Sequence, residues 1–286
     1  MDIRMRSGLV RAIAWLAMAA LGSFCATYAG AAIILVSKGQ ITTGSDTSGA
    51  FGTAGSNLAG QGYKLMIAYD DFSGTFHASS PTFEKQMGPV TGVVSVTVGG
   101  VPFSPVVTRS FGAFLYVNNN GVFSELAGFQ SGNDAQGQAV YAAHDLSSTT
   151  GTVTGPAIGM TAYTAVAGDV GLVNFSTSGA AGSASFTATP TAAWLVFPPP
   201  QLIASLVAYV RGLGLSGGIQ TSFLAKLAAA QADLVAGDSA SATQSITDFI
   251  NEAKAQSGKV LTSAQASQMI GQAQTILFTI GVIYSA

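Results

Sequence analysis

The chain has little cysteine, histidine or charge, and each shortage excludes a class of protein. It contains one cysteine and two histidines among 286 residues, and charged residues make up only 8% of it. A single cysteine cannot form an internal disulfide bond, and it supplies too few sulfur ligands for a structural zinc site. The few lysines and arginines form no basic cluster, which argues against nucleic acid or an anionic membrane surface as partner.

Recognisable catalytic motifs are also missing. His77 and the pair His144-Asp145 could act as bases, but region 32–197 has no G-x-S-x-G turn that would expose a serine nucleophile beside them. The glycine-rich segments lack the G-x-x-x-x-G-K-[ST] pattern of a phosphate-binding loop. These absences favour a protein that is not an enzyme.

Residues 1–31 have the pattern of a secretory signal peptide. Three arginines make the first eleven residues basic, Ala12–Phe24 is an uncharged apolar stretch, and Ala29-Gly30-Ala31 fits the A-x-A cleavage pattern. Cleavage before Ala32 would place the protein outside the cell, on its surface or in the periplasm. The alternative is a retained membrane anchor, but a span needs about 20 mostly apolar residues, and residues 22–32 are mainly small.

Cleavage would change the composition of the chain. Residues 1–31 hold Cys25, three of the eleven basic residues and one of the thirteen acidic residues, so the remaining 255 residues carry a net charge of −4 and no cysteine. Such a chain must be stabilised by buried apolar area, and its length suffices for one or two hydrophobic cores. We expect no membrane span in this mature chain, and a protein or glycan partner outside the cytoplasm.

Residues 32–197 are predicted to form an antiparallel β domain, either a sandwich or a barrel. The region is rich in Val, Thr, aromatic residues and glycine, and its apolar runs are short and bounded by turn residues. Gly99-Gly100 and Asn120-Gly121 supply the positive φ angles of tight hairpin turns. The expected strands include residues 63–69, 90–98, 101–108, 111–117, 169–177, 182–189 and 194–197, with residues 43–60 as a loop or an irregular strand end.

The composition changes at Pro198-Pro199-Pro200, which we interpret as an extended linker because proline lacks a backbone donor and restricts φ. Residues 201–286 beyond it have apolar residues at spacings of three and four, the period of amphipathic helices. Glycines follow three of these stripes as helix stops, and Thr262 with Gln265 matches the capping box of a helix start. We therefore predict a small four-helix bundle.

Two stretches of the chain resemble known kinds of exported protein. Residues 201–278 are similar to the FIMAH-type C-terminal module of exported bacterial proteins, through FLAKL at 223–227, AGD at 236–238, DFINE at 248–252, QSGK at 256–259 and LTSAQA at 261–266. That resemblance implies an accessory module without assigned catalytic residues. The segment SGAFGTAGSNLAGQGYKLMIAYDD resembles β-rich exported proteobacterial proteins of unassigned function.

Two kinds of binding site are compatible with the residues of the β region. Asp70, Asp71, Asn133 and Asp134 lie in predicted turns and offer oxygen ligands for calcium, although the D-x-D-x-D-G spacing is absent and such residues are common in turns. No other cofactor is expected. A carbohydrate-stacking surface could form from aromatic residues, which in strands more often belong to the core: Tyr63, Tyr69, Tyr116, Tyr141, Phe111 and Phe114.

These observations leave two functional hypotheses. The first is an exported, non-enzymatic protein with the β domain as an interaction or structural module and the helical domain as an accessory. The alternative is a secreted carbohydrate-binding or carbohydrate-active protein. Solvent-facing aromatic residues or two carboxylates in one cleft would favour the alternative.

Overall fold

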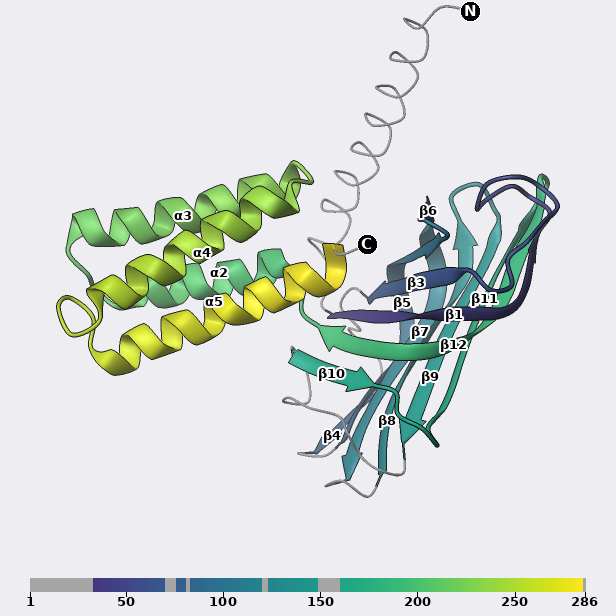
Figure 1. Ribbon diagram of the computed structural model, residues 1–286, viewed down its shortest axis with the longest axis horizontal. Helices are drawn as coiled ribbons and strands as arrows, with labels where there is room; N and C mark the ends of the chain where they lie inside the picture. Colours follow the sequence, from purple (N-terminus) through teal and green to yellow (C-terminus); the bar gives the residue numbers. More distant parts are fainter. Residues whose placement is uncertain (1–32, 70–75, 81–82, 120–122, 149–159, 285–286) are drawn as a thin grey trace, which may run out of the picture. The chain divides into compact units, whose positions relative to one another are not determined.

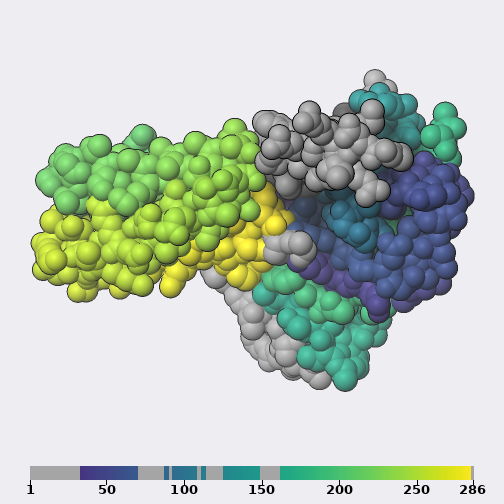
Figure 2. Space-filling view, turned by 45° about the horizontal axis from the view of Figure 1, so that its top comes forward, coloured from purple at the N-terminus to yellow at the C-terminus, as the bar shows by residue number. Residues whose placement is uncertain are grey.

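The computed structural model describes residues 33–69, 76–80, 83–119, 123–148 and 160–284. The chain divides into two compact units, one within residues 31–197 and one within residues 198–285. The first is made of strands and the second of helices (Figure 1). Among the described residues each unit comes from one stretch of chain, and the space-filling view colours the β unit from purple to green and the helical unit from green to yellow (Figure 2).

All strands of the β unit belong to one sheet, in which every strand pairing is antiparallel. The predicted antiparallel β region is thus confirmed. The strands are β1 (Ile33–Asp46), β2 (Ser56–Asn57), β3 (Gly62–Tyr69), β4 (Phe76–Ser80), β5 (Phe83–Val98), β6 (Val101–Phe103), β7 (Val106–Asn119), β8 (Phe123–Asp134), β9 (Ala139–Ser148), β10 (Met160–Thr164), β11 (Val170–Gly179) and β12 (Gly182–Val196).

Eight of these strands form a closed ring. Their order is β1, β3, β5, β7, β8, β9, β11 and β12, and β12 pairs again with β1 from Ile34↔Val196 to Asp46↔Ala184. Figure 1 shows β1 in purple beside β12 in green. Closure satisfies the backbone groups that an open sheet would leave unpaired at its two edges.

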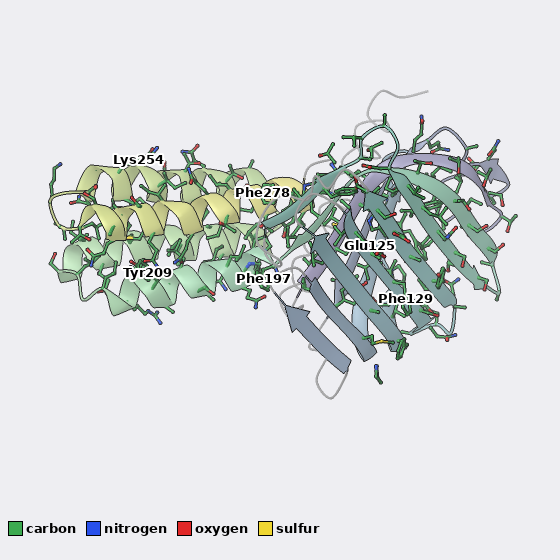
Figure 3. All side chains as sticks on the ribbon, turned by 90° about the horizontal axis from the view of Figure 1, so that it is seen from below. Glu125, Phe129, Phe197, Tyr209, Lys254 and Phe278 are labelled. Atoms are coloured by element: carbon green, nitrogen blue, oxygen red, sulfur yellow. The ribbon has the colours of Figure 1, made fainter. Side chains whose placement is uncertain are left out.

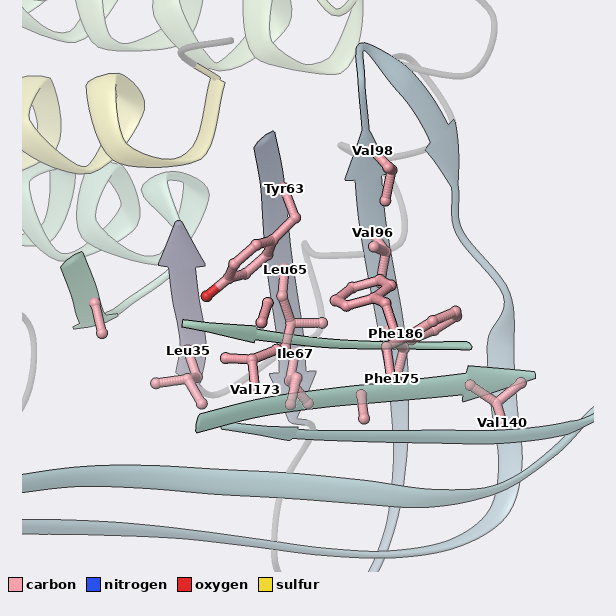
Figure 4. Packing of buried hydrophobic residues seen from close by; sticks show 14 of the residues in the cluster. Leu35, Tyr63, Leu65, Ile67, Val96, Val98, Val140, Val173, Phe175 and Phe186 are labelled. Carbon is pink, nitrogen blue, oxygen red and sulfur yellow. The ribbon is translucent and has the colours of Figure 1, made fainter. Parts of the chain in front are cut away.

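The sheet closes because alternate residues of its strands are apolar and point to one side. In β9, for example, buried residues alternate with exposed or half-buried ones along the whole strand. The side chains on the inner side pack into one hydrophobic cluster, part of which Figure 4 shows. Four phenylalanine rings lie together in it, with centroids 5.4–6.4 Å apart: Phe51, Phe103, Phe175 and Phe186.

The closed sheet is flattened, so that β3 lies opposite β8 across the interior. The hydroxyl of Tyr69 on β3 donates to the carbonyl oxygens of Ala113 and Phe129 at 2.9 and 3.2 Å. A Cβ atom on Gly128 would lie 2.8 Å from that hydroxyl oxygen and 2.7 Å from Cδ2 of Leu35. Only glycine therefore allows the two layers to approach this closely.

Asp46 organises the loop that follows β1. One carboxylate oxygen accepts from the backbone N–H groups of Ser48, Gly49 and Ala50 at 2.7–3.1 Å, and the other accepts from that of Phe51 at 2.7 Å. The side chain of Asp46 is fully buried. Residues 43–60 are thus an ordered strand end and loop, held by one anion.

The predicted turns and irregular strand agree with the structure where it describes them. Gly99 and Gly100 have φ of 55° and 86°, as a two-residue hairpin turn requires. The segment beyond them, which contains Pro102 and Pro105, forms only the three-residue β6 before β7 begins. The Asn-Gly turn predicted at residues 120–121 lies outside the described residues.

The helical unit contains α2 (Pro199–Gly212), α3 (Gly217–Val235), α4 (Ser239–Gln256) and α5 (Ser263–Tyr284), which confirms the predicted four helices. Their buried residues form one cluster, in which the Phe223 and Phe249 ring centroids are 5.1 Å apart. The capping box is present: Gln265 Oε1 accepts from the Thr262 N–H at 2.8 Å, and Thr262 Oγ1 accepts from the Gln265 N–H at 3.2 Å.

The prediction of an extended linker at residues 198–200 needs correction. Pro198 has extended φ and ψ of −57° and 136°, but Pro199 and Pro200 form the start of α2. The first N–H groups of a helix have no partner within it, so two prolines there cost no hydrogen bond, and their fixed φ suits a helix. The three prolines therefore start a helix. Within the described residues no helix is long and apolar enough to cross a membrane.

Candidate functional site

Strand pairing brings polar and aromatic residues together on the outer face of the β unit. Two neighbouring rows cross the strands β1, β12, β11, β9, β8 and β7 in that order. We call these two rows the outer strip. The first row is Ser45, Ser185, Ser176, Tyr141, Ser131 and Phe111, and the second is Thr43, Thr187, Asn174, Ala143, Phe129 and Ala113.

The half of the outer strip on β1, β12 and β11 borders a hollow of about 470 Å³. The residues that line it include the hydroxyl and amide residues of both rows on these strands, and Tyr141 of β9. Beside this hollow the register of β1 against β12 shifts between Lys38 and Gly39 and again between Ile41 and Thr43, an irregularity of the kind that bends a strand.

Hydrogen bonds already order part of this hydroxyl-rich half. The Thr187 hydroxyl donates to the side-chain oxygen of Asn174 at 3.2 Å, and the Thr42 hydroxyl donates to the Thr187 carbonyl at 2.8 Å. Serine and threonine hydroxyls can both donate and accept, and an amide offers each kind of group. The surface can therefore complement a ligand that also carries donors and acceptors together, such as one with many hydroxyl groups.

The other half of the outer strip is aromatic. Phe111 and Phe129 are stacked, with ring centroids 6.0 Å apart and an angle of 29° between the rings. The exposed fractions of Phe111 and Tyr141 are 41% and 40%. Figure 3 labels Phe129 and Glu125 on β8, four residues apart and so on the same face of the strand. Exposed rings in register across neighbouring strands can contact a planar apolar surface of a ligand.

The outer strip contains no charged residue, and two carboxylates lie beside it. Asp145 is two residues beyond Ala143 on β9, and Glu125 lies on β8, diagonally across from Asp145. Burial and then the charge of Asp145 raise the pKa of Glu125, and burial raises the pKa of Asp145. The two carboxylates give this border of the outer strip a negative character, which disfavours anionic ligands.

The predicted calcium ligands are only partly described. Asp70 and Asp71 lie outside the described residues. At the end of β8, the side-chain amide of Asn133 donates to the Gly137 carbonyl at 3.1 Å, and Asp134 Oδ1 accepts from the N–H groups of Gln136 and Gln138 at 2.9 and 2.8 Å. Both residues hold a turn. In the described parts of the chain, no three His, Cys, Asp or Glu side chains are grouped to hold a metal ion.

Among the described residues, the histidines form no site of the kind that a serine hydrolase needs. His144 points into the closed sheet, whereas Asp145 points outward, because successive residues of a strand face opposite sides. His144 is buried. Burial lowers the pKa of His144 to about 3, although the backbone of Leu126 opposes the shift. His77 is on β4, and its side chain lies outside the description.

Other polar groups in the interior are tied to the fold. The hydroxyls of Tyr63 and Ser37 share a hydrogen bond of 2.9 Å, and the Tyr163 hydroxyl donates to Asp169 at 2.9 Å. Burial raises the pKa of Tyr163 to about 12, with the Ser148 hydrogen bond opposing the shift and Asp169 adding to it. These groups stabilise a packed interior, and we assign them no ligand.

The structure separates the aromatic residues that the sequence grouped. Tyr63 and Tyr69 belong to the core, as strand aromatics usually do, whereas Tyr141 and Phe111 lie on the outer strip. The side chains of Phe114 and Tyr116 are outside the description. The sequence reasoning did not include Phe129 or the hydroxyl residues of the strip. In the sequence, the hydroxyl and amide residues of the strip can be recognised as small polar residues two positions apart, at 43/45, 174/176 and 185/187.

Comparison with known proteins provides no relative from which a role for this site could be inferred. No family model, no curated protein and no solved structure matches the chain.

Proposed function

We propose that this chain is an exported, non-enzymatic protein whose β unit is an interaction module and whose helical unit is an accessory docking or spacing element. The observation that carries the proposal is the outer strip, a surface of hydroxyls and exposed aromatic rings without a charged residue. Such a surface supplies contact area and hydrogen bonds, but it supplies no general acid, general base or activated nucleophile.

The helical unit supports the accessory role that its resemblance to the FIMAH-type module implies. Its core is formed from its own four helices. An ion pair between Lys226 and Glu252, at 2.7 Å, joins α3 to α4 and is reinforced by the Ser222 hydroxyl. These residues join α3 to α4 and stabilise the bundle, as expected of a module that positions or docks the β unit.

The proposal is tested in the organism that produces the chain. The full-length protein is expressed with its own N-terminal segment, and a photoreactive phenylalanine analogue replaces Tyr141. We expect the protein in the extracytoplasmic fractions with Ala32 as its first residue, and a cross-link from position 141 to a protein or glycan there. The same analogue at Val235, an exposed position on α3, serves as the control.

Two outcomes would contradict the proposal. Recovery of the intact chain in the cytoplasm would remove the export part. Release of reducing ends or other products from envelope material by the purified protein would show that it is an enzyme.

A further inference from the structure

We infer that the outer strip binds an extended, uncharged polysaccharide that lies across the strands. This inference rests on the proposed function, because it names the class of partner that the interaction module takes. It is carried by the register of the two rows, the hollow beside them and the chemistry of their side chains.

The dimensions of the outer strip suit a chain ligand. Neighbouring strands lie about 4.8 Å apart, so the two rows follow roughly 24 Å of the curved outer surface of the closed sheet, and Tyr141 and Phe111 are about 10 Å apart along it, across β8. A row of side chains at one-strand intervals thus offers repeated contacts along a curved path, and a linear polymer presents repeated groups along its length. The hollow of about 470 Å³ gives the hydroxyl half depth for one part of that polymer.

The side chains of the outer strip match both the apolar face and the hydroxyl-bearing edge of a sugar ring. The C–H face of a sugar is apolar and packs on an aromatic ring, which Tyr141 and the Phe111–Phe129 pair provide. The ring edge carries hydroxyl groups that donate and accept, as do Ser176, Ser185, Thr187 and Asn174. The aromatic and hydroxyl halves lie next to each other, so one extended chain would contact both.

The charges on and beside the outer strip favour a neutral polysaccharide over an anionic one, and its side chains favour a polysaccharide over a protein. The outer strip has no lysine or arginine to pair with a uronic acid or a sulfate group, and Asp145 and Glu125 beside it repel anions. A protein partner is less well matched, because stable protein interfaces centre on large apolar or arginine side chains that exclude water. The hydroxyl half offers neither kind of side chain.

The test is affinity electrophoresis of the full-length protein through gels that contain one polysaccharide each. Neutral arabinoxylan, mixed-linkage β-glucan, hydroxyethyl cellulose and dextran are the probes, and polygalacturonate is the charged comparison. We expect at least one neutral polymer to retard the protein, and polygalacturonate to have no effect. Tyr141→Ala and Phe111→Ala should each weaken retardation by about tenfold, and Asn174→Ala by about threefold.

A matched control distinguishes the outer strip from exposed apolar surface in general. Val166 is 43% exposed and lies in the loop before β11, outside the two rows, so Val166→Ala should leave retardation unchanged. Circular dichroism and thermal unfolding of each variant establish that it is folded, which is expected for these partly exposed positions.

Each result bears on the inference. No retardation by any neutral polymer, equal retardation by polygalacturonate, or unchanged binding by Tyr141→Ala and Phe111→Ala would overturn it. If position 141 cross-links to a protein while no polysaccharide binds, the polysaccharide inference fails and the interaction module stands. If neither is observed, both fail.

Discussion

The two units differ in how far apart in sequence their stabilising contacts lie. In the helical unit, consecutive helices pack together, α2 also packs against α5, and the caps bond residues three positions apart. In the β unit, the ring closes through pairing of β1 with β12, in which Leu35 lies opposite Leu195. The helices and their caps therefore depend on local sequence patterns, whereas the closed sheet depends on residues that meet only after the rest of the chain has folded.

Substitutions in β1 and β12, the two strands that close the ring, should destabilise the protein most. A Cβ atom on Gly39 would collide with the Thr189 carbonyl oxygen and lie 2.8 Å from Cα of Pro190. Because those atoms are backbone, we expect Gly39→Ala to lower the free energy of unfolding of the β unit by about 3 kcal/mol or more. Hydrogen exchange should show lost protection in β1 and β12 and retained protection in α3 and α4.

The control for this prediction lies in the other unit. Nothing lies within 4 Å of a Cβ atom on Gly271 in α5, so Gly271→Ala should be neutral or stabilise by up to about 1 kcal/mol. If Gly39→Ala unfolds both units together, the contrast between local and long-range stabilisation is wrong.

Buried His144 predicts that acid weakens the β unit before the bundle. Its pKa in the folded protein, about 3, is below the ordinary value of 6.5. Between these values the unfolded chain takes up a proton that the folded chain does not, so stability is complete above pH 6.5 and declines as the pH falls toward 3. Both histidines precede residue 198, so the bundle lacks this effect.

His144→Leu tests that prediction, because leucine fills a similar space and does not titrate. Its chemical denaturation, followed at several pH values, should show a smaller loss of stability between pH 6.5 and 4 than the unsubstituted protein. An identical pH dependence would mean that His144 is not buried in its neutral form.

Asp46 should have a moderate effect, confined to the end of the β unit that its loop covers. Burial raises the pKa of Asp46, but hydrogen bonds from Phe51, Ser48, Gly49 and Ala50 outweigh it and leave the pKa below its ordinary value of 3.8. Asp46→Asn removes the charge from these bonds, and we expect a loss of about 2 kcal/mol.

The pH dependence of Asp46→Asn gives this prediction a second readout. The stabilisation by the carboxylate is complete above the unfolded pKa and is lost as the pH falls through the lower folded pKa. The difference between Asp46→Asn and the unsubstituted protein should therefore shrink below about pH 4. A difference that stays constant to lower pH would indicate a steric effect of the amide.

The smallest predicted effect is at the cap of α5. Thr262→Ala removes one half of the capping box and should cost about 1 kcal/mol. The thermal unfolding of the helical unit should shift by a few degrees, and hydrogen exchange should be faster only at the first turn of α5. A larger change, or one in the β unit, would contradict the local character of this contact.

The helices and most turns could be predicted from the sequence because their causes are local. Thr262 and Gln265 are three residues apart, and Gly237, with φ of 79°, follows the apolar stripe of α3. Pro199 and Pro200 were misassigned because the same fixed φ suits both an extended linker and the first turn of a helix. Only the position of the helix that follows distinguishes the two.

The candidate site was predictable only in part. Tyr141 and Phe111 were among the aromatic candidates, but period-two alternation does not say which side of a strand becomes the interior. Tyr63 and Tyr141 both lie in strands, and the register of those strands alone places Tyr63 in the core and Tyr141 on the outside. Ser45, Ser185 and Ser176 come from three different strands, so no window of sequence contains them.

The sequence by itself determined the antiparallel β region, the four helices and their caps, since hydrophobic period, glycine and capping residues act within a few positions. Only the tertiary structure decided that β1 meets β12, that His144 points inward and Asp145 outward, and that twelve uncharged residues from six neighbouring strands all point outward. Strand pairing is the physical reason, because register and ring closure join residues whose spacing along the chain carries no signal of their contact.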